Sequence, residues 1–559
     1  MEKRTILAFV LSFALLIGWS MFFGPKQEQT IVKEKTVEQP KAEKEPADVS
    51  RDEERSREYI ETAKPLPEKT QSWSVQEKKI LVDTPLYRAV FTNAGPTIKS
   101  FKLKKYHKTT DPASPLIELV NLEKEFGNPL LVNFDSQHNA YRARTGTVYE
   151  VKGDRPIEMK QGDSPKSLVF TSPALNGIVT TQTFHFYPDQ YRIDLNVEVF
   201  NQSEKTITGA FNANIRALPP EEKKGYYSYV GLALLLNDEL EEVEIEDNSD
   251  NITLKGRIDW MAYEDDYFIS AVIPETEGKG SFNGQMLSSG LLEGTYIPPQ
   301  VSIKPLEKSS FAYALYLGPR DLSSLKKVQK KLDRAVNFGW TDIIARPLLY
   351  TLRFFNQYIN NYGVSIILLT ILIKILFWPL THKSYKSMKE MQKLQPRMAK
   401  LREKYKDNKE QLNKEMMGLY KTYKVNPMGG CLPMLIQIPV FFALFRILGA
   451  AIELRHAPFA LWITDLSAPD RLFNFPFKIP FMSPPSGIPV LTLLMGASMF
   501  LQQKMTPTPG DPTQAKIMML LPIIFTFMFI NFPSGLVLYW LVNNILSIGQ
   551  QYRIYKRPA

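Results

Sequence analysis

A single basic residue lies inside one of the longest apolar runs of the chain. Lys374 is the twelfth of the 19 residues 363–381 and the only charged residue among them. A charge near the middle of a membrane-spanning helix costs about 2.5–3.5 kcal/mol on insertion scales, so such a residue normally faces protein or water. Thr370 lies four residues earlier, on the same helix face. We therefore expect a functional, water-facing Lys374. The alternative is a lysine that only extends its stem toward the polar end of the run.

A second polar stripe lies near the C-terminus. Its residues follow one another at helical steps of four, three and four: Trp540, Asn544, Ser547 and Gln551. Asn543 lies alongside them, and Gln437 adds an amide to another apolar run. The apolar runs contain no Asp or Glu, so they offer Lys374 no carboxylate partner. We interpret these residues as a polar, positively charged hollow open to the cytoplasm, rather than as an ion pair or a proton relay.

Five apolar runs, the last of which holds two spans, predict a polytopic α-helical membrane protein with six spans. The first is long and has no A-x-A cleavage site, which favours an uncleaved anchor over a signal peptide. The last apolar run, residues 517–552, has 36 residues without a charge. It is too long for one span, and Pro533 divides it. The predicted spans are 1–23, 363–381, 428–450, 488–503, 517–532 and 534–552, the last five forming a helical core.

Charge is distributed unevenly and predicts the orientation. Residues 363–559 carry 23 basic and 9 acidic side chains, whereas residues 24–362 carry 43 and 48. Basic loops remain in the cytoplasm. The segments 382–427, 504–516 and 553–559 and the N-terminus are therefore expected there. Residues 24–362 and the loop 451–487 are expected on the far side. The same distribution argues against a soluble nucleic-acid binder, so no DNA partner is expected.

The exported segment has three parts. Residues 24–75 are rich in Lys, Glu, Gln and Pro and predict a disordered, charged tether. Residues 76–335 contain short Val-, Ile-, Thr- and aromatic-rich runs between turn residues, which indicate an antiparallel β-sandwich. An active site or a carbohydrate-binding cleft in it stays open, but without a motif a structural or docking module is favoured. Residues 336–362 predict an amphipathic helix, lying in the membrane interface or packed on the sandwich.

The cytoplasmic segment 382–427 shows two apolar seams at coiled-coil spacing. They predict an antiparallel two-helix hairpin. Its basic outer face fits RNA or anionic lipid head groups, or is simply solvated. The seams are Met391, Leu394, Met398, Leu401 and Tyr405, then Leu412, Met416, Leu419 and Tyr423.

Several classes of enzyme find no support in the sequence. Cys431 is the only cysteine, and the five histidines show no metal-ligand spacing. Nucleotide-binding and nucleophile-elbow motifs are absent from the sequence as well, so no cofactor or metal is expected and a non-enzymatic role is favoured. A polar hollow that opens to the cytoplasm beside apolar helix faces suits the transfer of hydrophobic polypeptides into lipid. A solute or lipid transporter using the same cavity is the first alternative, and an envelope scaffold is the second.

The segment 363–557 resembles the YidC/Oxa/Alb membrane insertases. The matching residues are Asn426 to Pro433, Gln437 to Pro439, Glu453 to Phe459, Trp462 to Ser467 and Phe532 to Trp540. The additional first span and exported sandwich are similar to the Gram-negative YidC type. The resemblance implies an inner-membrane insertase and folding chaperone that acts on nascent membrane proteins through a hydrophilic groove, alone or with the Sec translocon and its accessory subunits. It also implies ribosome contact through the hairpin and the short tail, and contact with membrane lipids.

The resemblance also assigns client contacts. In that family a charged residue of the second span, usually arginine, sits in the groove, and the matching position is Lys374. Lysine at this position keeps the positive charge of arginine but lacks its planar, bidentate guanidinium group. Thr370 and Trp540 match reported client-contact positions, the latter often tyrosine. The full candidate groove comprises Lys374, Thr370, Gln437, Phe441, Tyr539, Trp540, Asn543, Asn544 and Ser547.

Overall fold

The computed structural model describes most of the chain from residue 77 to residue 556. The undescribed internal stretches are 121–129, 137–146, 153–155, 221–228, 246, 277, 407, 424, 426–431 and 507–511, and the side chains of 409, 432–435 and 512–517 are outside the description too. The predicted first span 1–23, the tether 24–75 and the motif from Asn426 to Cys431 therefore lie outside the described residues.

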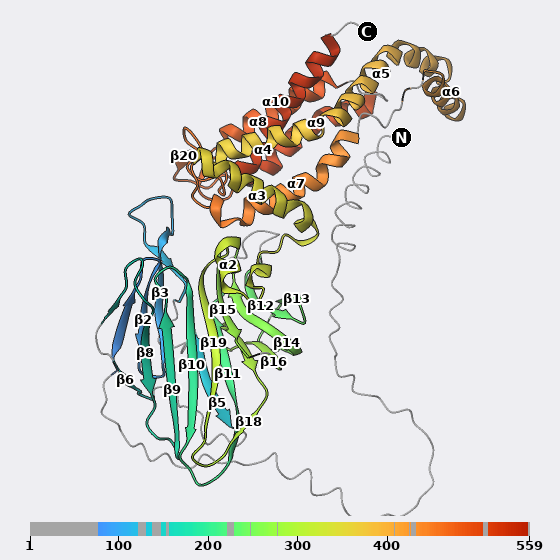
Figure 1. Ribbon diagram of the computed structural model, residues 1–559. Coiled ribbons are helices and arrows are strands. Elements are labelled where there is room, and N and C mark those ends of the chain that lie inside the picture. The colour runs from blue at the N-terminus through green and yellow to red at the C-terminus, as the bar shows by residue number, and fades with distance from the viewer. Residues whose placement is uncertain are drawn as a thin grey trace, which may run out of the picture. The chain divides into compact units, whose positions relative to one another are not determined.

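The β-rich part begins with a sheet of five strands (Figure 1). A hairpin joins the first two strands in the chain, and the last strand is added in parallel. Their order is β4 (Leu116–Glu118), β3 (Thr97–His107), β2 (Tyr87–Thr92), β1 (Lys79–Asp83) and β7 (Ile157–Glu158).

A second, larger sheet forms the rest of the β-rich part, and its strand pairs are antiparallel. Its main path is β18 (Val301–Ile303), β11 (Ile207–Ala217), β17 (Leu292–Ile297), β16 (Lys279–Met286), β14 (Asn251–Glu264), β15 (Phe268–Pro274), β19 (Lys308–Pro319), β10 (Arg192–Asn201), β9 (Ile178–Phe186), β8 (Lys166–Thr171) and β6 (Glu150–Lys152). Three further strands join it: β5 (Leu130–Ser136) on β11, β12 (Gly231–Leu236) on β14, and β13 (Glu239–Val243) on β12.

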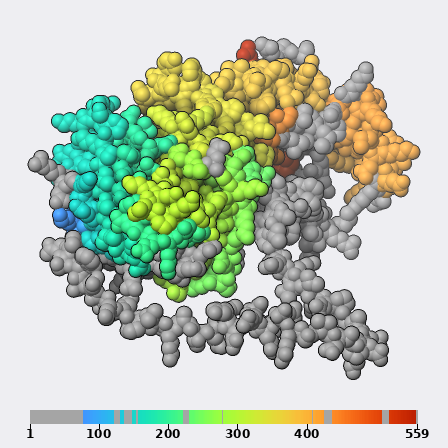
Figure 2. Space-filling view, turned by 60° about the horizontal axis from the view of Figure 1, so that its bottom comes forward, coloured from blue at the N-terminus to red at the C-terminus, as the bar shows by residue number. Residues whose placement is uncertain are grey.

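Alternation along the strands explains why these layers pack. In β10 every second side chain, from Ile193 to Val199, is buried, while the side chains between them are partly or fully exposed. Each fully buried aliphatic side chain contributes about 1.5–3 kcal/mol. Phe91 of the small sheet meets Phe184 and Phe186 of the large one, with ring centroids 5.1 and 5.4 Å apart. The predicted β-sandwich is thus present, and Figure 2 shows its residues, blue to yellow-green, gathered into one body.

The long strand β14 turns the large sheet over on itself. Its first half, Asn251–Arg257, pairs with β16, and its last residues, Met261–Glu264, pair with β15. Tyr296 of β17 and Tyr313 of β19 consequently meet edge to face in the core, 6.4 Å apart. One face of the β16–β17–β11 region stays outside this core and lines a polar cleft.

Helices make up most of the remainder (Figure 1). α2 (Leu322–Val328) follows the last strand of the large sheet, and a two-stranded hairpin, β20 (Leu472–Phe475) and β21 (Ser486–Ile488), lies in the predicted loop 451–487. The other helices are α3 (Asp342–Ile359), α4 (Tyr362–Leu376), α5 (Trp378–Lys404), α6 (Lys409–Thr422), α7 (Leu432–Ala450), α8 (Val490–Met505), α9 (Pro512–Phe529) and α10 (Ser534–Lys556).

Helix lengths differ from the predicted spans in one important place. The run 363–381 was expected to form one helix, but α4 ends at Leu376 and α5 starts at Trp378 with a bend of 66°. Pro379 occupies the first turn of α5, where its missing N–H costs nothing. Within the described residues no single helix is long and apolar enough to cross a bilayer, whereas this bent pair passes the length and composition test. The number of six spans stays a prediction.

α5 and α6 form the expected helical hairpin. Met391, Leu394 and Met398 of α5 are buried against partly buried side chains of α6, Met416 and Leu419 among them. Tyr423, predicted in the seam, is exposed, and Tyr420 packs there in its place. α3, predicted to lie in the interface or on the sandwich, packs against α4 and α7.

Candidate functional site

α4 presents one buried face and one exposed face. Asn361 caps its N-terminus by accepting a hydrogen bond from the Val364 amide at 3.1 Å. The exposed face carries Leu372, Ile375 and Leu376. The buried face follows helical spacing and comprises Gly363, Ser365, Ile366, Leu369, Thr370, Ile373 and Lys374. The lysine thus shares a face with small and apolar residues and turns inward.

Lys374 meets two polar residues of α10. Its ammonium donates to Asn543 Oδ1 at 3.1 Å and to Ser547 Oγ at 2.6 Å. The Ser547 hydroxyl donates in turn to the backbone carbonyl of Asn543 at 2.7 Å. The lysine side chain is only 8% exposed, so it is more enclosed than the water-facing residue expected from the sequence. No carboxylate pairs with it among the described residues, so neutral dipoles alone compensate the charge.

Two of the predicted groove residues point elsewhere. Thr370 is buried, and its hydroxyl donates to the carbonyl of Ile366 in its own helix at 2.7 Å. Asn544 is also buried, and its amide donates to Ser498 Oγ of α8 at 2.9 Å. These contacts hold helices in place and leave both side chains outside the lysine cluster.

The remaining predicted residues form two contacts beside the lysine cluster. The Gln437 amide donates to the Tyr539 hydroxyl at 3.0 Å, which joins α7 to α10. Phe441 meets Trp540 edge to face, with ring centroids 4.8 Å apart. Trp540 belongs to a larger aromatic cluster, defined here as Phe441, Phe445, Phe525, Phe529, Phe532 and Trp540. Trp540 of this cluster and the two residues that accept hydrogen bonds from Lys374 therefore lie on the same helix, α10.

Sequence reasoning missed the continuation of the polar contacts onto α5. The Gln550 amide donates to Thr381 Oγ1 at 3.0 Å. The Tyr385 hydroxyl interacts with Ser547 and Gln551. Thr381 and Tyr385 follow Lys374 at steps of seven and four, a helical spacing that would have revealed them. The predicted boundary at residue 381 separated them from the lysine.

Several residues that carry the family resemblance position helix ends. Trp462 donates to Asp470 Oδ1 at 2.6 Å, and the other oxygen of Asp470 accepts the amides of Leu491 and Thr492 in the first turn of α8. The Gly535 amide at the start of α10 donates to the Leu466 carbonyl at 2.9 Å. A Cβ on Gly535 would lie 3.1 Å from that oxygen, which explains the glycine. Asp470 was not singled out from the sequence.

The β-rich part contains a second cation with different surroundings, Arg320, whose side chain is 12% exposed. Arg320 lies 3.5 Å from Glu264 and donates to the backbone carbonyls of Asp265 and Ala335. Burial raises the pKa of Glu264 from 4.5 to about 7, against the opposing effect of the Arg320 charge. Here the cation and a carboxylate are buried together.

Comparison with known proteins identifies the class. The described residues combine an apolar helical part that holds a buried cation with a large β-rich part, as expected for a membrane protein with an extramembrane domain. Residues 354–559 match the family described as 60Kd inner membrane protein, and residues 79–351 match the YidC periplasmic domain. The chain belongs to the YidC family of membrane protein insertases. Its function is membrane protein insertion, its clients are nascent membrane proteins, and the β-rich part is its periplasmic domain.

Two relatives that match over nearly the whole chain support this assignment. A protein of Syntrophobacter fumaroxidans named Membrane protein insertase YidC is 42% identical, with 99% of each chain covered. A protein of the same name from Syntrophus aciditrophicus is 44% identical, with 100% of each chain covered. A solved structure, described as an active YidC insertase with the first transmembrane domain resolved, shows 17% identity and a TM-score of 0.37, covering 86% of this chain and 93% of that one.

Proposed function

We propose that the polar face shared by α4 and α10 receives the hydrophilic flank of a client, while the aromatic cluster guides the client's apolar part toward lipid. The observation that carries the proposal is the buried ammonium of Lys374, which is bonded to the neutral groups of Asn543 and Ser547. A carboxylate on a client can form with Lys374 the ion pair for which the described residues supply no acid. A cation already paired with a carboxylate would have no such capacity.

The free energies follow from solvation. Moving an unpaired amide or hydroxyl into hydrocarbon costs about 2–7 kcal/mol, depending on the reference state. Hydrogen-bonding side chains along α4, α5 and α10 replace part of the water that the client's flank loses. Burial of the client's apolar segment in lipid then drives the transfer. The mechanism requires no bond to be made or broken, in keeping with a non-enzymatic role.

Access to Lys374 requires an exchange of partners. With the lysine 8% exposed, an incoming group must displace Asn543 or Ser547 from the ammonium. Hydrogen bonds to a charged group contribute about 1.5–3 kcal/mol each, and a charged client group returns at least that amount. Neutral partners that yield to a charged one make the site selective for an acidic or strongly polar flank.

The orientation and the further partners are part of the same proposal. The basic excess of residues 382–427 supports a cytoplasmic hairpin with both termini on that side, by the positive-inside rule. In that orientation the hairpin is placed to meet a translating ribosome weakly, and the exposed apolar faces of the helices meet lipid. Cooperation with the Sec translocon is proposed on the family resemblance alone.

Site-specific photocrosslinking tests the client path. A photoreactive amino acid at Trp540 or Asn543 should form adducts with a stalled nascent chain of an inner-membrane protein. Ile545 is the matched control, because it lies on the same helix with its side chain 54% exposed. Thr370, attractive from the sequence, is a poorer probe because its side chain is buried. Equal adduct yields at 543 and 545, or none at 540 and 543, would contradict the proposed path.

A further inference from the structure

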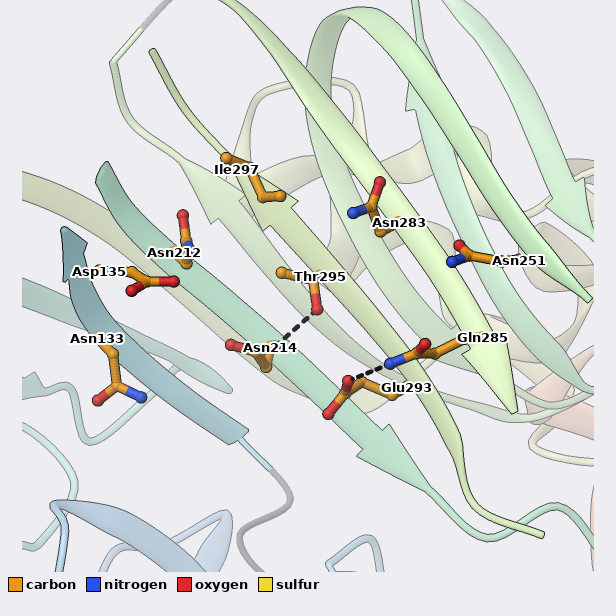
Figure 3. Close-up of a pocket in the computed structure, with 10 residues that line it drawn as sticks. All are labelled: Asn133, Asp135, Asn212, Asn214, Asn251, Asn283, Gln285, Glu293, Thr295 and Ile297. Atoms are coloured by element: carbon orange, nitrogen blue, oxygen red, sulfur yellow. Dashed lines mark hydrogen bonds between the residues drawn. The ribbon is translucent and has the colours of Figure 1, made fainter. Parts of the chain in front are cut away.

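A polar cleft lies on one face of the large sheet (Figure 3). Its lining residues are distant in sequence from Lys374 and α4. Five neighbouring strands, β5, β11, β17, β16 and β14, supply its lining, and its volume is about 250 Å³. Nine of the ten lining side chains are polar. They are Asn133, Asp135, Asn212, Asn214, Asn251, Asn283, Gln285, Glu293 and Thr295, with Ile297 as the apolar member.

Strand register places these side chains in rows. Asn214, Thr295 and Asn283 are direct neighbours across β11, β17 and β16, and the Asn214 amide donates to Thr295 Oγ1 at 2.6 Å. In the next row Gln285 donates to one oxygen of Glu293 at 2.8 Å, and Arg216 donates to the other at 2.5 Å. Figure 3 shows the first two of these bonds along the floor of the cleft.

Two acceptors in the cleft have no partner. Asp135 Oδ1 and Asn212 Oδ1 are buried atoms without a hydrogen bond in the part of the chain that the structure describes. A buried unsatisfied acceptor costs about 1–3 kcal/mol. Both side chains line one cleft from adjacent strands, so a ligand toward which they turn would give each of these oxygens a hydrogen-bond donor.

The lining selects among ligand classes. Lysine does not occur in it, and the nearby Arg216 is paired with Glu293, so an anionic ligand would meet Asp135 without a free cation among the described residues. No aromatic ring lines the cleft in the described part of the chain, and Ile297 alone is apolar, which disfavours a greasy peptide. β11, β16 and β17 each pair on both sides, so over these strands a peptide finds little free backbone edge to extend.

We propose that this cleft binds a neutral sugar ring, free or at the end of a glycan chain. Amide side chains offer donors and acceptors together, and each sugar hydroxyl is at once a donor and an acceptor. The unpartnered oxygens of Asp135 and Asn212 accept two of the sugar hydroxyls. The volume of about 250 Å³ limits the occupant to one or two rings.

Ligand-observed saturation-transfer NMR on the full chain in lipid nanodiscs tests this assignment. Maltoside detergents are avoided because their head groups are sugars. The probes are glucose, galactose, N-acetylglucosamine and its linear tetramer, with glucose 6-phosphate and an apolar hexapeptide for comparison. A neutral sugar should bind saturably with a Kd of about 1 mM. The phosphorylated sugar should bind at least about tenfold more weakly, which is 1.4 kcal/mol. Comparison of the monomer with the tetramer tells a free sugar from a glycan end.

Asn212→Leu is the decisive variant, with Asn196→Leu as its control. Asn212→Leu removes an unsatisfied acceptor, so it should keep or raise the melting temperature while sugar binding falls at least about tenfold. Asn196 is an exposed asparagine on β10 of the same sheet and outside the cleft lining, so its replacement should change neither. Insertion of clients should be normal in both variants. The proposal is wrong if no neutral sugar binds saturably, if binding survives Asn212→Leu, or if the hexapeptide binds in its place.

Discussion

Lys374 and Arg320 are both cations with little exposed side-chain surface, but they differ in what surrounds them. Lys374 is held by Asn543 and Ser547, which are neutral. Arg320 lies against Glu264 and is bonded to two backbone carbonyls. The arginine is therefore compensated within the fold, whereas the lysine is solvated by dipoles and keeps its capacity for an ion pair.

The comparison shows how burial alone fails to separate structure from function. Removing one member of a buried ion pair leaves an uncompensated charge and destabilises the fold strongly. Removing a cation held only by neutral groups leaves hydroxyls and amides that can bond to one another. We therefore expect Arg320 to determine the stability of the fold and Lys374 to determine the rate of client insertion.

The largest expected effect is on the stability of the periplasmic domain. Arg320→Met leaves Glu264 buried without its cation and two carbonyls without their donor, so we expect a loss of about 3–5 kcal/mol. Urea unfolding of the full chain in nanodiscs, followed by hydrogen exchange of β14 and β15, measures it. A loss below about 1 kcal/mol would mean that Arg320 is not the structural cation described here.

Charge reversal at Lys374 should act on insertion. Lys374→Glu is expected to slow insertion of a client with an acidic translocated flank by about tenfold, because like charges then meet in a poorly hydrated site. Lys374→Arg keeps the charge and should insert the same client at nearly the wild-type rate. Insertion rates into proteoliposomes, compared with those of a client with a neutral flank, provide the measurement. Normal insertion of the acidic client by Lys374→Glu would remove the electrostatic role.

Glu264 should give the Arg320 region a characteristic pH dependence. Its raised pKa of about 7 means that the folded state holds a proton that the unfolded state releases near 4.5. The free energy of unfolding therefore falls as the pH rises through this range. Relative to Glu264→Gln, the wild type should lose about 1 kcal/mol between about pH 6 and about pH 8. Arg320, Glu242 and Asp265 also act on this carboxyl, and they are present in both proteins. If the free energies of unfolding of the two proteins change in parallel over this pH range, Glu264 does not titrate there.

The smallest expected effect is on stability at the lysine itself. Lys374→Met removes a buried charge and keeps a similar apolar volume, so the free energy of unfolding should change by less than about 1 kcal/mol. The same variant should insert the acidic client more slowly. Thermal unfolding of Lys374→Met beside Arg320→Met gives the comparison in one experiment, and similar losses in both variants would abolish the distinction between the two cations.

Helical periodicity placed Thr370 and Lys374 on one face of α4, and the structure buries that face. It linked Lys374 to the stripe of α10, and the structure joins them through Asn543 and Ser547. Phe441 and Trp540, two further residues of the candidate groove, are in contact with each other. Periodicity does not identify the neighbouring helix, however. Asn544 lies about 100° around α10 from Asn543 and consequently faces Ser498.

Other features depended on contacts that are distant in sequence. Arg320 and Glu264 meet because β15 pairs with both β14 and β19 and so brings the ends of these two strands together, which no local pattern records. The bend between α4 and α5 did have a local signal in Pro379, but the apolar run concealed it. The short motif that precedes α7 lies outside the described residues, so its part in the site stays a prediction.

The water accessibility of the Lys374 cluster tests the central claim most directly. Asn543→Cys and Ile545→Cys, each in a Cys431→Ser background, would be treated from the cytoplasmic side with a membrane-impermeant maleimide. A thiol at 543 replaces the side chain that contacts the lysine ammonium, whereas the control at 545 lies on the exposed apolar face of the same helix. The account predicts clearly faster labelling at 543 than at 545. Equal or slower labelling at 543 would show that the cluster is closed to water and would contradict a polar route for clients.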